Sequence, residues 1–189
     1  MTNSGLVYVF TGEGKGKTSA ALGVATRSLL LGKKVVWVAF YKQESWGLAE
    51  AKLKDKFPNL TMEFVGKGFR IGKKTAPVGN QGHVVVDSAS EEEHKAAAIK
   101  GLDRVKEKLA EKPFLLVMDE VLNAVSEGLL DEKDVLNVID QRGETHVILT
   151  GRVGVSARMI LAGADLVTEC KKIKHPYDSG KLAVRGLDF

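Results

Sequence analysis

A stretch rich in glycine and lysine lies near the amino terminus, where residues 11–19 read TGEGKGKTS. Glycines allow successive backbone N–H groups to converge on an anion. A helix that begins after them adds unsatisfied N–H donors and a partial positive charge. Lys17 can bring its ammonium group to the same anion, and the Thr18 hydroxyl suits magnesium. The stretch therefore predicts a phosphate-binding loop of the P-loop type.

The spacing of this loop differs from that of the common P-loop. Four residues usually separate the first glycine from the Gly-Lys pair, whereas three separate Gly12 from Gly16 here, and Thr11 occupies the usual glycine position. We interpret the stretch as a shortened P-loop. A glycine-rich turn that only connects a strand to a helix is the alternative interpretation.

Two further motifs follow apolar runs. FLLVMDEV (114–121) places Asp119 and Glu120 at the carboxyl end of a predicted buried strand, where P-loop proteins hold a carboxylate near magnesium. VILTGRVG (147–154) ends another such strand with Gly151 and Arg152, and an arginine can bind phosphate bidentately. The alternatives are an acidic helix start for the first motif and a solvated surface arginine for the second.

The elements that must position these residues alternate along the chain. Apolar runs at 6–10, 35–40, 60–65, 114–118, 145–149 and 165–169 predict strands, mostly buried on both faces as in a parallel sheet. Helices are predicted at 17–31, 46–57, 91–112, 120–127, 132–141 and 154–163. In the longest of them, Ser90 can cap the start and Pro113 stops the end. The alternation predicts one doubly wound α/β domain over 1–189, with a mostly parallel sheet of about six strands and helices on both faces.

Residues 66–90 interrupt this alternation. The segment contains five glycines and four basic residues, and long loops in compact domains are usually functional or mobile. We expect a mobile substrate loop here; a disordered surface excursion is the alternative.

Composition limits the classes of protein that fit. The 189 residues are 44% hydrophobic and 28% charged, as in an ordinary globular protein, and the net charge of +4 suits an anionic small ligand. A single cysteine, Cys170, excludes an internal disulfide and a cysteine-built zinc site. Neither a signal peptide nor an apolar run long enough to span a bilayer is present, so we expect a cytoplasmic protein without a membrane partner.

The order and spacing of four motifs resemble one family across nearly the whole chain. TGEGKGKTSAALG, MDEV, VILTGR and the terminal KHPYDSGKLAVRGLDF are similar to the ATP:corrinoid adenosyltransferases of the cobalamin pathway, of P-loop and RecA-like fold. The resemblance implies that a reduced Co(I) corrinoid attacks the 5′ carbon of ATP, so that the adenosyl group moves to cobalt and triphosphate leaves. It also implies Mg²⁺, a reductase that supplies electrons, and a homodimer.

The resemblance assigns roles to individual residues. Lys17 and Arg152 would be catalytic, because they neutralise the leaving triphosphate. Thr18 and Glu120 would serve the magnesium, with Asp119 beside them. Phe69, in VGKGFRIG, would face the corrinoid, whereas Ile71 stands where many members carry tryptophan, which leaves open how the lower axial ligand of cobalt is displaced. The residues implied to surround the triphosphate are Gly12, Glu13, Gly14, Lys15, Gly16, Lys17, Thr18 and Ser19.

Three other functions compete with this one. A P-loop ATPase that acts on nucleic acid would use a basic stripe with stacking aromatics, but aromatic residues are only 6% of the chain, so we expect no nucleic-acid partner. A small nucleoside kinase would commonly carry a cysteine zinc site, which one cysteine cannot build. A non-catalytic nucleotide-binding module is separable only by assay.

Overall fold

The computed structural model describes residues 4–69, 76–78, 83–85 and 89–188. Six parallel strands form one sheet in the order β3-β2-β6-β7-β1-β8. This confirms the predicted α/β class, and every pairing in the sheet is parallel. The strands are β1 (Val7–Thr11), β2 (Val35–Ala39), β3 (Leu60–Phe64), β6 (Leu115–Asp119), β7 (His146–Thr150) and β8 (Leu166–Glu169).

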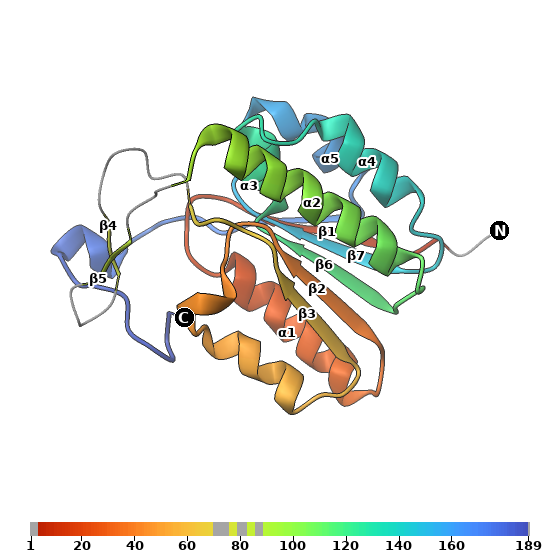
Figure 1. The fold of residues 1–189 in the computed structure, drawn as a ribbon, viewed down its shortest axis with the longest axis horizontal. Helices are drawn as coiled ribbons and strands as arrows, with labels where there is room; N and C mark the ends of the chain where they lie inside the picture. The colour runs from red at the N-terminus through yellow and green to blue at the C-terminus, as the bar shows by residue number, and fades with distance from the viewer. Residues whose placement is uncertain (1–3, 70–75, 79–82, 86–88, 189) are drawn as a thin grey trace.

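Helices cover both faces of the sheet, as Figure 1 shows. One face carries α1, together with the 3-10 helix η2, and the other carries α2 to α5. Side chains that alternate along each strand divide the core accordingly. In β2, Val36 and Val38 face the α2 side, whereas Val35 and Trp37 face the α1 side. The bounds are α1 (Lys17–Leu30), α2 (Glu91–Leu109), α3 (Val121–Ser126), α4 (Glu132–Asp140), α5 (Arg158–Gly163), η1 (Glu44–Trp46), η2 (Ala49–Asp55), η3 (Val155–Ala157) and η4 (Pro176–Ser179).

Local signals account for the ends of α2. Ser90 accepts a hydrogen bond from the Glu93 N–H while the Glu93 carboxylate accepts one from the Ser90 N–H, which forms a capping box. The helix ends at Leu109, before Pro113. The predicted cap at Ser90 is therefore confirmed.

Two predicted helices are wrong in type or extent. In place of the helix predicted at 46–57, the structure has two separate 3-10 helices, η1, which ends at Trp46, and η2, because Gly47 between them adopts the left-handed conformation (φ 61°) and stops the first. The segment 154–163 begins as the 3-10 helix η3 and becomes α-helical only at Arg158. A third helix, predicted from residue 120, starts one residue later because Glu120 itself has φ 63°.

The segment 66–90 is not structureless throughout. It contains an antiparallel pair, β4 (Ala76–Val78) and β5 (His83–Val85), which was not predicted from the sequence. The chain that leads into this segment runs beside the end of β2 and the residues after it: the Val65 N–H donates to Ala39 O at 3.0 Å and the Gly68 N–H to Tyr41 O at 3.0 Å. A side chain on Gly66 would put its Cβ 2.1 Å from the Tyr41 carbonyl carbon, so only glycine fits there.

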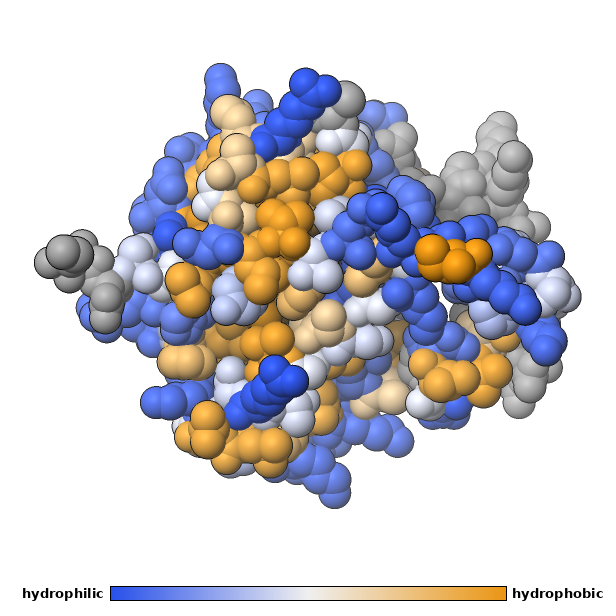
Figure 2. Space-filling view, turned by 180° about the vertical axis from the view of Figure 1, so that it is seen from behind, coloured by the Kyte–Doolittle hydropathy of each residue, from blue (hydrophilic) through white to orange (hydrophobic). Residues whose placement is uncertain are grey.

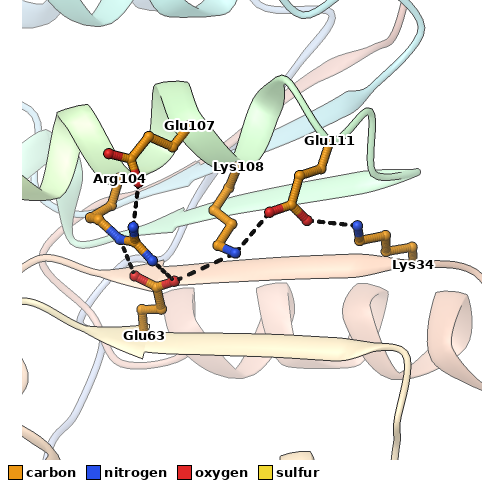
Figure 3. A network of polar contacts seen from close by, with 6 residues as sticks. All are labelled: Lys34, Glu63, Arg104, Glu107, Lys108 and Glu111. Carbon is orange, nitrogen blue, oxygen red and sulfur yellow. Dashed lines mark hydrogen bonds and ion pairs between the residues drawn. The ribbon is translucent and has the colours of Figure 1, made fainter.

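A network of ion pairs joins α2 to the strand edge, as Figure 3 shows. Glu63 of β3 accepts two hydrogen bonds from Arg104, at 2.8 and 2.7 Å, which is the bidentate geometry that favours this pair. The hydrogen bond from Arg104 lowers the pKa of the Glu63 carboxyl. The network therefore fixes α2 over β3, the strand that leads into residues 65–69. Its members are Lys34, Glu63, Arg104, Glu107, Lys108 and Glu111.

An apolar band crosses the surface that is seen when the view of Figure 1 is turned by 180°, as Figure 2 shows. At the sheet edge, β8 pairs only with β1 within the described sheet, and Val167 on it is 46% exposed. A separate groove of about 330 Å³ lies at the amino-terminal ends of the strands, lined by residues that include Leu6, Phe114 and His146. That groove is remote from the carboxyl ends, where open α/β sheets bind their ligands.

Candidate functional site

The P-loop lies at the carboxyl end of β1, where the sequence places it. Gly16 is the N-cap of α1, and Lys17 is the first helical residue. The first turn, 17–20, which the structure describes in full, contains no acidic residue. By contrast, α2 and α4 both begin with acidic side chains. The amino end of α1 thus keeps its partial positive charge for an external anion.

The glycines of the loop are required by the segment that follows β8. A Cβ on Gly12, whose φ is +105°, would lie 2.5 Å from Cys170 O, and a Cβ on Gly14 would lie 2.7 Å from the same atom. The Gly14 N–H donates to Cys170 O at 2.7 Å. The backbone at Cys170 therefore supports the loop from behind, a role that the sequence around it does not indicate.

Lys17 is held against the loop that it serves. Its ammonium donates to Gly12 O at 2.7 Å and to Gly14 O at 2.8 Å. An ammonium has three donors, so these bonds position the charge and leave a further donor for a ligand.

Asp119 is the most enclosed charged group of the site, with a side chain that is 0% exposed. Its Oδ1 accepts hydrogen bonds from Thr150 at 2.7 Å and from Thr18 at 3.1 Å. Its Oδ2 lies 3.0 Å from Lys42 Nζ, and the same ammonium contacts Glu50 at 2.9 Å. Burial would lower the pKa of Lys42, but attraction to Asp119 and Glu50 outweighs burial and raises it well above its ordinary value.

Glu120 occupies the turn between β6 and α3 in a left-handed conformation. Its N–H donates to Thr150 at 2.8 Å, and its Oε2 accepts from Asn123 at 2.7 Å. Burial, and then the negative charge of Asp119, raise the pKa of the Glu120 carboxyl to about 7, against attraction from Lys42, Lys17 and Arg152.

Arg152 reaches the P-loop from the end of β7. Its Nε lies 3.0 Å from Glu13 Oε2, and both side chains are exposed. The backbone of Arg152 is fixed to α3, because its N–H donates to Asn123 at 2.5 Å and its carbonyl accepts from Ser126 at 2.9 Å. Asn123 therefore connects Arg152 to Glu120, and the structure places both beside the loop.

Other predicted loop residues lie at its surface. Lys15 pairs with Asp188 from the carboxyl-terminal segment, and that pairing lowers the pKa of the Asp188 carboxyl, as does the hydrogen bond from the Val184 N–H. Ser19 is exposed on the first turn of α1.

The donor set at this edge fits a magnesium ion that is shared with a nucleotide. Within the described residues, no group of three His, Cys, Asp or Glu side chains could hold a metal ion. Mg²⁺ commonly uses one or two carboxylates and a hydroxyl, together with substrate phosphates and water. Thr18 and the carboxylates beside it supply that partial set.

Phe69 belongs to an aromatic cluster at the base of the 66–90 segment. Its ring stacks on Tyr41, with centroids 5.4 Å apart and planes at 19°, and it contacts Trp46 at 5.8 Å and 31°. Tyr41 is 2% exposed and donates its hydroxyl to Glu127 at 2.9 Å. Phe69 is partly buried against the core, so it anchors this segment whatever else it does. Ile71 lies outside the described residues.

Several residues of the site were not predicted from the sequence. Thr150, Asn123 and Lys42 all contact a predicted carboxylate. A signal for Lys42 was present, because it is a basic residue soon after the carboxyl end of a buried strand, as Arg152 is. Tyr41 and Trp46 complete the aromatic cluster, and nothing in their spacing indicates Phe69 as the partner.

Comparisons with known proteins agree with this geometry. The family model "ATP:corrinoid adenosyltransferase BtuR/CobO/CobP" matches residues 3–189. The Corrinoid adenosyltransferase of Escherichia coli K12 is 32% identical over 187 residues, which cover 98% of this chain and 86% of that protein. Corrinoid adenosyltransferase CobA of Salmonella typhimurium is 32% identical, with the same coverage.

A likeness among solved structures concerns the fold alone. The flagellar accessory protein FlaH from Methanocaldococcus jannaschii superposes with a TM-score of 0.57 at 13% identity, covering 89% of this chain and 72% of that one. Since the family model spans nearly the whole chain and the curated relatives exceed 30% identity, the chain belongs to the ATP:corrinoid adenosyltransferase family.

Proposed function

We propose that this protein transfers the 5′-deoxyadenosyl group of ATP to the Co(I) of a reduced corrinoid, in adenosylcobalamin synthesis or salvage. The cobalt electron pair forms the Co–C bond, the C5′–O bond breaks, and its electrons leave on triphosphate. The observation that carries the proposal is family membership over residues 3–189, combined with an intact phosphate-binding loop.

The charges around the loop suit this leaving group. Lys17 donates to Gly12 of the loop, Arg152 pairs with Glu13 of the same loop, and α1 begins directly after it. Such charges accelerate a reaction only where they stabilise the transition state more than the ground state. Negative charge that develops on the departing triphosphate oxygen meets this condition, so we assign Lys17 and Arg152 to its stabilisation.

We assign magnesium to Thr18 and Glu120, with Asp119 beside them. When bound, the ion would supply additional positive charge to the triphosphate. Support comes from the Thr18 hydroxyl of α1, which contacts Asp119 at the end of β6, and from Asn123, which holds Glu120 in place. We assign ATP contacts to residues 12–19.

The corrinoid side of the proposal rests on Phe69 and on the 66–90 segment. The aromatic cluster lies just beyond β2, one residue from Lys42, which contacts Asp119. The apolar ring of Phe69 thus lies near the proposed nucleotide site without being part of it. We propose that the segment is a substrate loop of a single domain, 1–189.

Partners other than the two substrates are also proposals. We propose that a reductase supplies the electrons that form Co(I), as the resemblance to the family implies. A homodimer follows from the family, and the exposed edge at β8 gives it a candidate surface; sedimentation velocity tests it. Among the described residues, none of the helices is long and apolar enough to cross a membrane, and a cytoplasmic location stays a prediction.

The decisive experiment follows the products. The protein is incubated with ATP, magnesium and chemically reduced corrinoid, with phosphorus NMR for phosphates and absorbance for the Co–C bond. We expect intact triphosphate and adenosylated corrinoid in equal amounts, and no ATP consumption without Co(I). Corrinoid-independent release of ADP and phosphate would refute the proposal and favour a nucleic-acid ATPase, whereas ATP binding without turnover would favour a non-catalytic module.

A further inference from the structure

Lys42 is a buried cation that the reaction as described does not use. Its side chain is 11% exposed and lies between Asp119 and Glu50, which are 0% and 9% exposed. Removing charges from water is costly even when they are paired, so this buried ion-paired group needs a reason to stand at the ligand edge of the sheet.

The contacts of Asp119 indicate what Lys42 does. Oδ1 is used by the hydroxyls of Thr18 and Thr150, and Oδ2 faces the Lys42 ammonium at 3.0 Å. Within the described residues Oδ1 is therefore hydrogen-bonded, whereas Oδ2 makes no hydrogen bond and is paired only with the Lys42 charge; the side chain is fully buried. A second cation beside Oδ2 would be repelled by the first.

Glu120 has different partners. Its Oε2 accepts from Asn123, and among the described residues no hydrogen bond or ion pair reaches its Oε1. It lies directly at the turn that follows β6, and the positive charges of Lys42, Lys17 and Arg152 attract its carboxylate. Of the two adjacent carboxylates, Glu120 is the one with an oxygen left for a ligand.

We propose that Lys42 is a positioning residue that decides which carboxylate binds magnesium: it engages Asp119 and leaves Glu120 as the metal ligand. The inference rests on the proposed magnesium site at Thr18 and Glu120. Asp119 then acts through Thr18, by orienting its hydroxyl, rather than by direct coordination. Glu50 fixes Lys42 from the other side, and it ties η2 to the nucleotide edge.

The experiment measures metal-dependent ATP binding without corrinoid, so turnover plays no part. Calorimetry gives the ATP dissociation constant with and without Mg²⁺, and the ratio of the two is the metal contribution. In the wild-type background, Glu120→Ala should reduce this ratio by at least about 10-fold, because losing a direct ligand should cost no less than the roughly 10- to 100-fold typical of losing an outer-shell partner, and Asp119→Asn should reduce it less. In a Lys42→Met background the order should reverse, because Asp119 gains a free oxygen.

Control variants distinguish the proposed role of Lys42 from the proposed magnesium site itself. Lys42→Arg keeps the charge and should keep the wild-type order, as should Glu50→Gln, which leaves the Lys42–Asp119 pair. Should Lys42→Met fail to unfold cooperatively, Lys42→Gln replaces it. If Glu120→Ala and Asp119→Asn have the same effects in both backgrounds, the role of Lys42 is refuted while the magnesium site stands. If neither changes the ratio in any background, the magnesium site itself is refuted, and the inference with it.

Discussion

Replacing Phe69 with alanine separates two roles for this ring, anchor of the 66–90 segment and contact for the corrinoid. The change removes two aromatic contacts, to Tyr41 and to Trp46. Such pairs contribute about 0.5–1.5 kcal/mol each in addition to the apolar area that they bury, so the folded protein should lose about 1–3 kcal/mol from these two contacts alone. In a domain of this size that corresponds to a fall of about 2–12 °C in Tm. If the ring also contacts the corrinoid, one further contact of about 0.5–1.5 kcal/mol should lower kcat/KM for corrinoid about 2- to 13-fold.

Phe114 provides a matched control at the opposite end of the sheet. Its ring makes an edge contact with His146 at 4.8 Å and lies 5.4 Å from the Lys33 ammonium. Phe114→Ala should therefore lose about 1–2.5 kcal/mol of stability while its corrinoid kinetics stay at the wild-type values. Tm, the ATP dissociation constant and the corrinoid kcat/KM are measured for both variants. If both lose stability and Phe69→Ala retains wild-type kcat/KM per folded molecule, Phe69 is an anchor only.

Three further changes test other parts of the site. Lys17→Ala should weaken ATP binding roughly 10- to 160-fold, from about 1.5–3 kcal/mol of lost charge-assisted hydrogen bonding; near-normal affinity by calorimetry would remove the P-loop assignment. Burial and Asp119 raise the pKa of the Glu120 carboxyl to about 7 in the folded protein. As pH rises, the unfolded chain therefore loses the Glu120 proton before the folded protein does. The free energy of unfolding should fall between about pH 4.5 and 7 as a result. Glu120→Gln should accordingly raise the Tm of the ligand-free protein at pH 8 and change it little at pH 5, and an equal shift at both would contradict the raised pKa. Gly66→Ala should push residues 66–69 away from Tyr41, because its Cβ would lie 2.1 Å from the Tyr41 carbonyl carbon, and should lower corrinoid kcat/KM as Phe69→Ala does; an unchanged Tm and kcat/KM would show that the backbone there adapts.

Patterns confined to short stretches of the sequence determine much of this protein. The run at 35–40 predicted a strand that spans Val35–Ala39, because a doubly buried parallel strand must be apolar at every position. Ser90 and Glu93 determined the start of α2 through contacts three residues apart. The P-loop is likewise local, since one turn and one helix end create its donors.

Tertiary structure decided what each site residue contacts. Asp119 and Glu120 are adjacent and chemically alike, yet only the strand order brings Lys42 and Thr150 to Asp119 while Asn123 turns toward Glu120. Likewise, the backbone at Cys170 explains Gly12, although 158 positions separate residue 12 from residue 170. Such contacts depend on which strands become neighbours, and sheet order arises from the packing of the whole domain. Local periodicity therefore predicts which residues reach the ligand edge, and only the folded chain determines which of them remain free to bind.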